Sequence, residues 1–389
     1  VTGLTVVDTQ GAFSLFGEVV ILSLIQVGGL GFMTMSTLVF LALGKRITFR
    51  ERLLMKEALN VESVQGIVKL AKYILGFTFT MEAIGALFLA LRWSSDLPWG
   101  TAIYYGIFHA VSAFCNAGFD LFSVSLQPYR GDVLVNLVIT FLIIVGGIGF
   151  AVISEVLYHR RGNQGLSLHT RLATSVTAFL LVIGFLSMLI FEFNNPASLG
   201  NLPVREKVLA AYFQAVVPRT AGFSTIDIGR LRPVTQFVMI ILMFIGASPG
   251  STGGGIKTTT FGSLLVVVYA VVTGKVDFEL LRRRIPAITI FKALVIFIIS
   301  VGVILAAMIA LLSVEQFGFL PLLFEVTSAF GTVGLSTGIT SSLSTAGKVI
   351  LVLVMYIGRV GPLTLAFALA ERFKRRPLLR YPEEQILVG

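Results

Sequence analysis

The chain has 389 residues, of which 56% are hydrophobic and 13% are charged. Soluble globular domains contain about 45–50% apolar and about 25% charged residues, so the composition excludes an ordinary soluble protein. Most of the basic residues behind the formal net charge of +10 follow certain apolar segments. This pattern is typical of cytoplasmic loops and accounts for the charge without a nucleic-acid partner.

Seven apolar segments are long enough to cross a bilayer as helices, which takes about 20 residues. They cover residues 14–43, 73–91, 134–158, 172–191, 236–272, 290–312 and 349–370. Three shorter apolar stretches, at 101–114, 208–218 and 319–330, lie between spans on the side that is poor in lysine and arginine. Stretches of that length are typical of re-entrant helices, which are tolerated at membrane depth where protein or water surrounds them. The sequence therefore predicts an all-α polytopic membrane protein.

Each short stretch ends in a glycine-containing loop, and the three loops align. Phe108, Tyr212 and Phe324 each stand ten positions before the loop glycine. The aligned loop residues are Asn116, Ala117 and Gly118, then Thr220, Ala221 and Gly222, then Thr332, Val333 and Gly334. Thr2 and Gly3 supply a fourth, shorter copy. Arg219, directly before the third copy, counts among the basic residues of the outer connections.

The spans that follow the loops repeat as well, because Gly28, Gly146, Gly246 and Gly358 occupy matching places. The sequence thus predicts four tandem helix–pore loop–helix repeats around a pseudo-fourfold pore, with the leading helix of the first repeat missing. The expected repeats cover residues 1–72, 73–171, 172–289 and 290–389, the third with a broken helix and the fourth with a cytosolic tail.

Four glycine loops around one axis would form a ring of backbone oxygens. Glycine accepts positive φ and lets neighbouring carbonyls approach closely, and such a ring can replace the hydration shell of an alkali cation. Asp8, Asp120 and Asp227 follow loop glycines by two to five positions. They could raise the local cation concentration at an outer mouth, or they could be solvated carboxylates and turn caps; both interpretations remain open.

The segment from Gly246 to Lys257 interrupts the apolar stretch 236–272. Its proline and glycines disfavour a regular helix. The segment resembles a phosphate-binding loop, but Ile256 displaces Lys257 by one place and no strand pattern precedes it. An irregular loop beside a cavity is favoured, and a simple helix kink is the alternative.

Arg359 lies near the middle of the span 349–370. An ionisable residue at that depth should face the interior or a water-filled cavity. It could act on a pore, or it could pair with Glu155 or cap carbonyls of the irregular loop. His109 and Cys115 have no ligand or catalytic partners in the sequence pattern, so no enzyme is predicted.

These features resemble the Ktr/Trk/HKT family of potassium-uptake proteins, and the compact size is similar to that of the bacterial Ktr membrane subunits. The resemblance covers essentially the whole sequence. In that family one filter glycine from each repeat selects potassium, and Gly3, Gly118, Gly222 and Gly334 occupy those places. Sodium-preferring plant relatives carry serine at the first place, whereas this chain has Gly3, which favours potassium.

The resemblance also implies a gate, a charge below the filter and a regulator. The implied gate residues are Gly250, Ser251, Thr252, Gly253, Gly254, Gly255 and Lys257. Arg359 would project below the filter and oppose cation occupancy. The implied setting is a homodimer in the lipid of a bacterial cell membrane, controlled by a cytosolic ring of nucleotide-binding RCK subunits.

Three basic segments are expected to dock that ring, namely the loops at 45–56 and 275–284 and the tail from Arg372. Potassium at backbone carbonyls is then the transported ion, no cofactor is bound covalently, and any nucleotide sits on the regulatory partner. The alternative is a secondary transporter of another cation or solute. Such proteins often carry inverted repeats, whereas the basic residues here follow the second span of every repeat and indicate parallel repeats.

Overall fold

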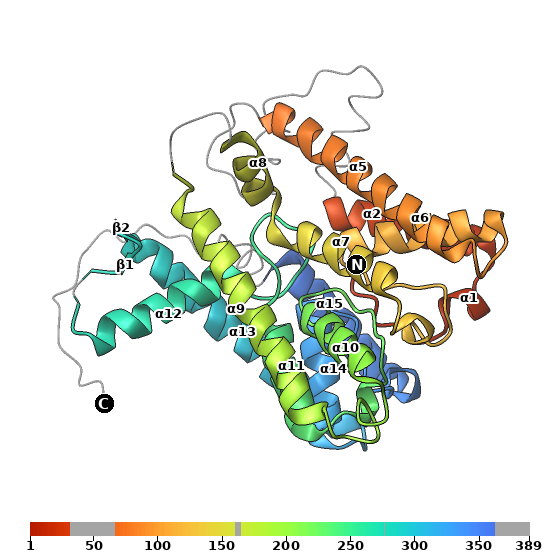
Figure 1. The fold of residues 1–389 in the computed structure, drawn as a ribbon. Helices are drawn as coiled ribbons and strands as arrows, with labels where there is room; N and C mark the ends of the chain where they lie inside the picture. Colours follow the sequence, from red (N-terminus) through yellow and green to blue (C-terminus); the bar gives the residue numbers. More distant parts are fainter. Residues whose placement is uncertain (32–66, 160–164, 276, 362–389) are drawn as a thin grey trace.

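The computed structural model describes residues 1–31, 67–159, 165–275 and 277–361 (Figure 1). Three of its helices are long and apolar enough to cross a membrane, namely α5 (Ile67–Trp93), α9 (Leu168–Glu192) and α13 (Ala287–Val314). In the most apolar part of α9 and of α13 only 28% of the residues are buried inside the protein. Helices that are apolar on exposed faces need an apolar surrounding, so these faces lie against lipid in a multi-pass membrane protein.

Three shorter helices follow the long ones: α6 (Trp99–Phe114), α10 (Val204–Val216) and α14 (Phe319–Gly331). They cover the predicted short stretches and are too short to span a bilayer. Their C-terminal halves are buried, and the aligned Phe108 and Phe324 have no exposed surface. In α10 the aligned Tyr212 is partly buried, and the next residue, Phe213, has no exposed surface.

The loops after the short helices lead into inner helices, namely α7 (Val133–Ile148), α11 (Pro233–Phe244) and α15 (Thr345–Val360). The first repeat contributes α1 (Thr9–Ala12) and its inner helix α2 (Leu15–Leu30). One turn of 3₁₀-helix precedes each of the three later inner helices, at Gln127–Tyr129, Ile228–Arg230 and Thr340–Ser342. Each described hairpin therefore descends through a short helix and returns through a loop before the inner helix begins.

The prediction of one continuous span over 134–158 is wrong. The inner helix α7 ends at Ile148, and α8 (Phe150–His159) leaves it at an angle of 97°. Gly149 joins them with a φ of 97°, a conformation open to glycine. Hydropathy could not reveal this break, because both halves are apolar. The helices α2 and α15 end at Gly31 and Gly361 with φ of 82° and 93°, and the rest of the spans 14–43 and 349–370 lies outside the described residues.

In the third repeat α11 and α12 (Thr258–Val272) are separated by an irregular loop, as the sequence favours. A two-stranded hairpin of β1 (Glu279–Leu280) and β2 (Arg283–Arg284) connects α12 to α13. It falls within the basic segment 275–284, and the side chains of Arg282, Arg283 and Arg284 are exposed.

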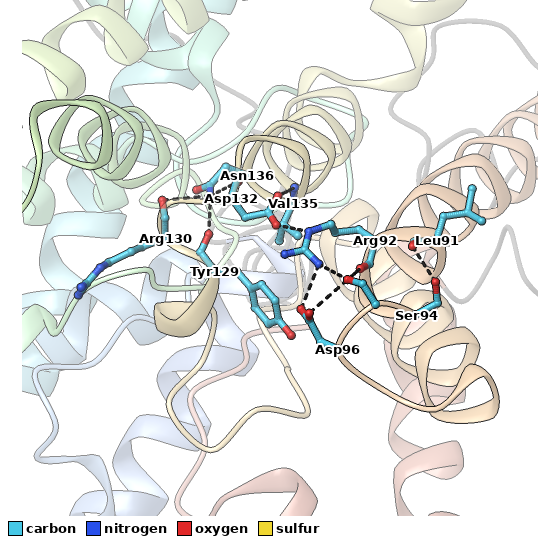
Figure 2. Close-up of polar contacts among 10 residues, drawn as sticks. Leu91, Arg92, Ser94, Asp96, Tyr129, Arg130, Asp132, Val135 and Asn136 are labelled. Atoms are coloured by element: carbon cyan, nitrogen blue, oxygen red, sulfur yellow. Dashed lines mark hydrogen bonds and ion pairs between the residues drawn. The ribbon is translucent and has the colours of Figure 1, made fainter.

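Polar bonds tie the outer end of each long helix to the start of the inner helix of the same repeat. In Figure 2 Arg92, near the end of α5, bonds Asp132, whose other carboxylate oxygen accepts a hydrogen bond from the Val135 N–H at 3.1 Å. The equivalent bonds run from the backbone N–H of Arg232 to Glu192 at 2.9 Å and from that of Ser344 to Glu315 at 2.9 Å. One N-terminal donor of each of these inner helices is thereby satisfied, and each hairpin is tied at its outer end.

Candidate functional site

The loops after α6, α10 and α14 share a strained backbone. Two residues before the glycine, Asn116, Thr220 and Thr332 have φ of 52°, 72° and 52°. Positive φ is uncommon outside glycine and is an outlier for β-branched threonine. The glycines also have positive φ, of 70° at Gly3, 72° at Gly118, 77° at Gly222 and 93° at Gly334. Strain of this kind persists where the surrounding structure holds it, and it concentrates at functional sites.

The four loop glycines lie against one another around one centre. A Cβ added at Gly118 would lie 2.7 Å from the Cα of Gly222, and one added at Gly222 would lie 3.4 Å from the Cα of Gly334. A Cβ at Gly334 would lie 3.2 Å from the Cα of Gly3, and one at Gly3 would lie 3.0 Å from the carbonyl carbon of Gly118. The loops therefore follow one another in chain order around a closed ring in which no side chain fits.

The predicted neighbours of these glycines lie in the same ring. Ala117, Ala221, Val333 and the three polar residues before them have no exposed surface. The Asn116 amide and the Thr220 hydroxyl lie 3.1 Å apart and join two loops directly. The carbonyl oxygen of Thr2 lies close to the Cα of Gly334, and a Cβ added at Gly334 would collide with it.

Buried polar residues brace the loops as they leave the ring. Glu325 accepts hydrogen bonds from the Thr337 N–H at 3.0 Å and the Thr340 hydroxyl at 2.7 Å. His109 donates from Nδ1 to the carbonyl of Tyr105 at 2.8 Å and accepts at Nε2 from the Leu121 N–H at 3.3 Å. Glu325 therefore braces the loop of the fourth repeat, and His109 braces that of the second.

The role of His109 was missed, although a signal was available. His109 and Glu325 both stand one position after the aligned aromatic residue of their repeats. A polar side chain at that place in a buried short helix has to find a partner, and the returning loop is the nearest one.

The sequence also missed a polar cluster below the second loop. Glu82 on α5 accepts a hydrogen bond from the Gln26 amide of α2 at 3.1 Å, and its other oxygen lies 3.8 Å from the Cys115 thiol. Glu82 is only 5% exposed. The cluster joins the first two repeats directly beneath the ring.

The irregular loop between α11 and α12 lies against the ring on its inner side. A Cβ added at Gly253 would lie 3.1 Å from the Cβ of Thr220, and one added at Gly254 would lie 3.1 Å from the Cβ of Thr332. These threonines belong to the strained ring positions, so the loop packs directly on the ring.

The break in α7 holds the irregular loop in place. The N–H groups of Ser248 and Thr252 donate to the carbonyls of Gly147 and Gly146 at 2.9 and 3.2 Å. The Thr252 hydroxyl donates to the carbonyl of Phe114, the last residue of α6, at 3.1 Å. These bonds connect the loop of the third repeat to α6 and α7 of the second.

Two cations bind carbonyls around the same loop. Lys257 Nζ donates to the carbonyl of Gly253 at 2.7 Å. The Arg359 guanidinium donates to the carbonyl of Thr252 and to those of Gly28 and Gly29 at the end of α2, the last at 3.1 Å. Among the roles that the sequence leaves open for Arg359, these hydrogen bonds show the capping of carbonyls of the irregular loop. Glu155, the other partner considered, accepts a hydrogen bond from the Ser167 hydroxyl at 2.6 Å.

The acidic residues after the loops differ from one another. Asp227 accepts from the Gly229 N–H at 3.0 Å and pairs with Arg230, so it is a turn cap. Asp120 accepts from the Phe122 N–H at 3.1 Å. Burial raises the pKa of Asp120 to about 6, and the nearby carboxylate of Asp8 adds to the shift.

Comparisons with known proteins agree on one family. Residues 1–375 match the family model described as "TrkH: Cation transport protein". Over 389 residues the chain is 46% identical to the Ktr system potassium uptake protein B of Bacillus subtilis, covering 100% of this chain and 87% of that protein. It is 40% identical to the protein of the same name from Vibrio alginolyticus, with coverages of 100% and 85%. The potassium/sodium uptake protein NtpJ of Enterococcus hirae is also 40% identical, with coverages of 100% and 87%.

A solved structure has the same fold. The crystal structure of the potassium transporter TrkH from Vibrio parahaemolyticus matches 96% of this chain and 76% of its own, with a TM-score of 0.71 and 18% sequence identity. The basic segment 45–56 and the tail from Arg372 lie outside the described residues, so the structure describes only the segment 275–284, apart from residue 276.

The half-buried Asp120 predicts a pH-dependent stability. Its pKa is raised in the folded protein above the value of about 3.9 for an unfolded chain, so the wild type should lose stability as the pH rises from about 4 to about 6. Asp120→Asn keeps an acceptor for Phe122 and carries no charge. The Tm of the variant minus that of the wild type, measured in detergent, should grow over this range and then level off. A difference that stays constant or shrinks would contradict the assignment.

Proposed function

This chain belongs to the TrkH family of cation transport proteins, and on this premise we propose that it takes up potassium across the cell membrane through the ring of Gly3, Gly118, Gly222 and Gly334. Members of the family are transport proteins and not enzymes. The observation that carries the proposal is the closed ring of four glycines with positive φ, in which every loop touches the next. Two relatives that match this chain over its full length are named as potassium uptake proteins.

The ring acts as a selectivity filter through its backbone. Potassium gives up water most easily to closely spaced carbonyl oxygens, and the loops carry no charged side chain among Thr2, Gly3 and their aligned counterparts. The short helices α6, α10 and α14 end at the loops, so the negative ends of their dipoles favour a cation there. Potassium is therefore the transported ion, and the filter needs no bound cofactor.

The proposal extends to the repeat boundaries at 1–72, 73–171, 172–289 and 290–389. Each of the last three units holds one short helix, one strained loop, one inner helix and all but the first three to six residues of its long helix, because α5, α9 and α13 begin ahead of the boundaries at 73, 172 and 290. The second candidate function is transport of another cation by the same ring, sodium above all, because a 40% identical relative is named for potassium and sodium uptake.

The irregular loop is proposed as the gate of this pathway. It packs on Thr220 and Thr332 directly below the ring, and ions that leave the ring toward the cytoplasm have to pass it. Gly250, Ser251, Thr252, Gly253, Gly254, Gly255 and Lys257 form the part that would move. The loop is held by hydrogen bonds to the ends of α6 and α7, to Phe150 of α8 and to Arg359 instead of by a helix, so opening breaks these bonds without unfolding a helix.

Arg359 is proposed to have two effects in one place. Its bonds to Thr252 hold the gate shut, and its charge below the ring opposes the entry of a second cation from the inside. The guanidinium also donates to carbonyls at the end of α2, so a movement of the first repeat would change the position of Arg359 against the gate of the third.

Control of the gate is assigned to a cytosolic ring of RCK-type nucleotide-binding subunits acting on a homodimer of this chain. Two of the three relatives named above carry the word "system" in their names, which supports a partnered membrane component. The exposed arginines of the β1–β2 hairpin offer a basic contact next to α12, the helix that leaves the gate. The segments at 45–56 and from Arg372 complete the proposed docking surface.

Gly118→Ser tests the filter. At a φ of 72° and with its Cβ 2.7 Å from the Ala221 carbonyl oxygen, a serine cannot enter without moving the neighbouring loop. The preference for potassium over sodium, measured as cation flux into proteoliposomes, should fall about tenfold, which corresponds to about 1.4 kcal/mol. Gly100→Ser, at a glycine with open space around it, is the matched control. Unchanged selectivity in Gly118→Ser would refute the filter.

Thr252→Val tests the gate. The variant keeps the shape of the side chain but loses the hydrogen bond to Phe114, whose net contribution is about 1 kcal/mol. Rubidium flux without the regulatory ring should therefore rise about fivefold. Thr80→Val removes a similar bond within α5, to the carbonyl of Gly76, and should leave the flux unchanged. Equal fluxes in both variants would count against a gate at Thr252.

Neutralising the hairpin tests the partner. Replacement of Arg282, Arg283 and Arg284 by alanine should weaken binding of the RCK-type ring at least about tenfold in a pull-down or titration, because the contact is charge-driven. Replacement of Arg205 and Arg232, on the opposite side of the membrane, should not. If binding of the ring is unchanged when this hairpin and the segments at 45–56 and from Arg372 are all neutralised, the proposed docking surface is excluded. A monomeric mass in detergent would exclude the dimer.

A further inference from the structure

Arg219 is a buried charge beside the ring, not a residue of the outer surface as its place in a basic-poor connection suggests. It is only 6% exposed, and its Nε donates no hydrogen bond to any described residue. None of the ion pairs found within the described ranges involves it. Buried charges are normally paired, because an unpaired one is costly. A cation kept without a partner therefore calls for a reason.

The surroundings of Arg219 offer it no anion. The residue lines a cavity of about 10 Å³, room for about one water molecule. The other lining residues are Ile143, Ile144 and Gly147 of α7, Leu181 of α9 and Val216 of α10. No carboxylate belongs to this lining, so the charge is not neutralised within the cavity.

The backbone of Arg219 adjoins the ring. It directly precedes Thr220 and stands three positions before Gly222. Its own N–H donates to the carbonyl of Val216 at 3.2 Å, in the turn that ends α10. The C-terminus of a helix carries partial negative charge, which a cation offsets. Arg219 thus sits on the negative helix end that points at the ring in the third repeat.

The other described repeats have no cation at this position. The residue three before the ring glycine is Cys115 in the second repeat and Gly331 in the fourth. In the second repeat the carboxyl of Glu82 lies 3.8 Å from that cysteine. The field at the ring is therefore uneven, and its positive side belongs to the repeat that carries the proposed gate.

We propose that Arg219 is a specificity-determining residue, a fixed positive charge that weakens cation binding in the ring and excludes divalent cations. This inference rests on the proposed function and adds to it how the ring separates ions by charge. Potassium and barium are close in size, so a ring of oxygens distinguishes them poorly by fit. A fixed charge distinguishes them because its repulsion is proportional to the charge of the ion.

The proportionality gives a signature that a packing role cannot produce. If removal of the charge tightens the binding of a monovalent ion by some factor, it should tighten that of a divalent ion by about the square of this factor. A change in loop shape would alter the binding of both ions without this relation between the two factors, or it would weaken the binding of both.

The test uses Arg219→Met, which keeps the length of the side chain and removes its charge, and Arg219→Lys, which keeps a charge only while the lysine stays protonated, so all fluxes are measured at about pH 6. The readouts are the half-saturating rubidium concentration and the barium concentration that halves rubidium flux, in proteoliposomes of the full chain. In Arg219→Met the half-saturating rubidium concentration should fall roughly fivefold, and the half-inhibiting barium concentration should fall roughly twenty-five-fold. In Arg219→Lys both concentrations should stay within about twofold of the wild-type values.

Lys207→Met is the matched control. Lys207 is also buried and also belongs to α10. Its ammonium, however, donates to the carbonyl of Phe193 at 3.0 Å and lies over the aromatic ring of the same phenylalanine. It lies twelve residues before Arg219, roughly 18 Å along a helix. Neither ion should bind more tightly in this variant. Thermal unfolding in detergent checks that each variant is folded, and Arg219→Met should unfold at or above the wild-type temperature because it removes an unpaired buried charge.

If Arg219→Met tightens the binding of rubidium and barium by the same factor, or if the folded variant binds neither ion more tightly, the inference is overturned while the filter assignment stands. Absence of rubidium flux in the wild type would instead reject the proposed function. A barium factor near the square of the rubidium factor, seen in Arg219→Met alone, would establish the charge as the cause.

Discussion

The contact on which the rest of the structure depends is the approach of four backbones without a side chain between them. At Gly3, Gly118, Gly222 and Gly334 even one added carbon would collide with the next loop. Helices alone cannot create this meeting point, since a helix keeps its neighbours about 8–10 Å away. The short helices end early so that the strained loops can close the ring, and the buried braces at His109 and Glu325 keep those loops in place.

Contacts between repeats, more than contacts within them, determine what surrounds the ring. Arg359 of the fourth repeat binds carbonyls of the first and the third. The irregular loop of the third repeat is hydrogen-bonded to α6 and to the break in α7, both of the second. A displacement of one repeat therefore changes the hydrogen bonds of another, which is the condition for coupling between distant parts of a protein.

The frame is repetitive, but its charges are not. Three repeats share the strained loop and the polar bond at the outer end. Arg219 and the irregular loop belong to the third repeat alone, and Glu82 lies in the second. A symmetric backbone suffices to surround an ion, whereas regulation and discrimination by charge need side chains that differ between repeats.

The sequence by itself determined the membrane class, the short helices and the places where the chain must bend. Apolar lengths and the register of Phe108, Tyr212 and Phe324 are local properties that every sequence window carries. Only the tertiary structure decided the 97° break at Gly149, the partner of Arg359 and the burial of Arg219. The reason is physical: hydropathy adds up side chains along one segment, whereas a break depends on backbone dihedrals, and the state of a charge depends on groups that come from other segments.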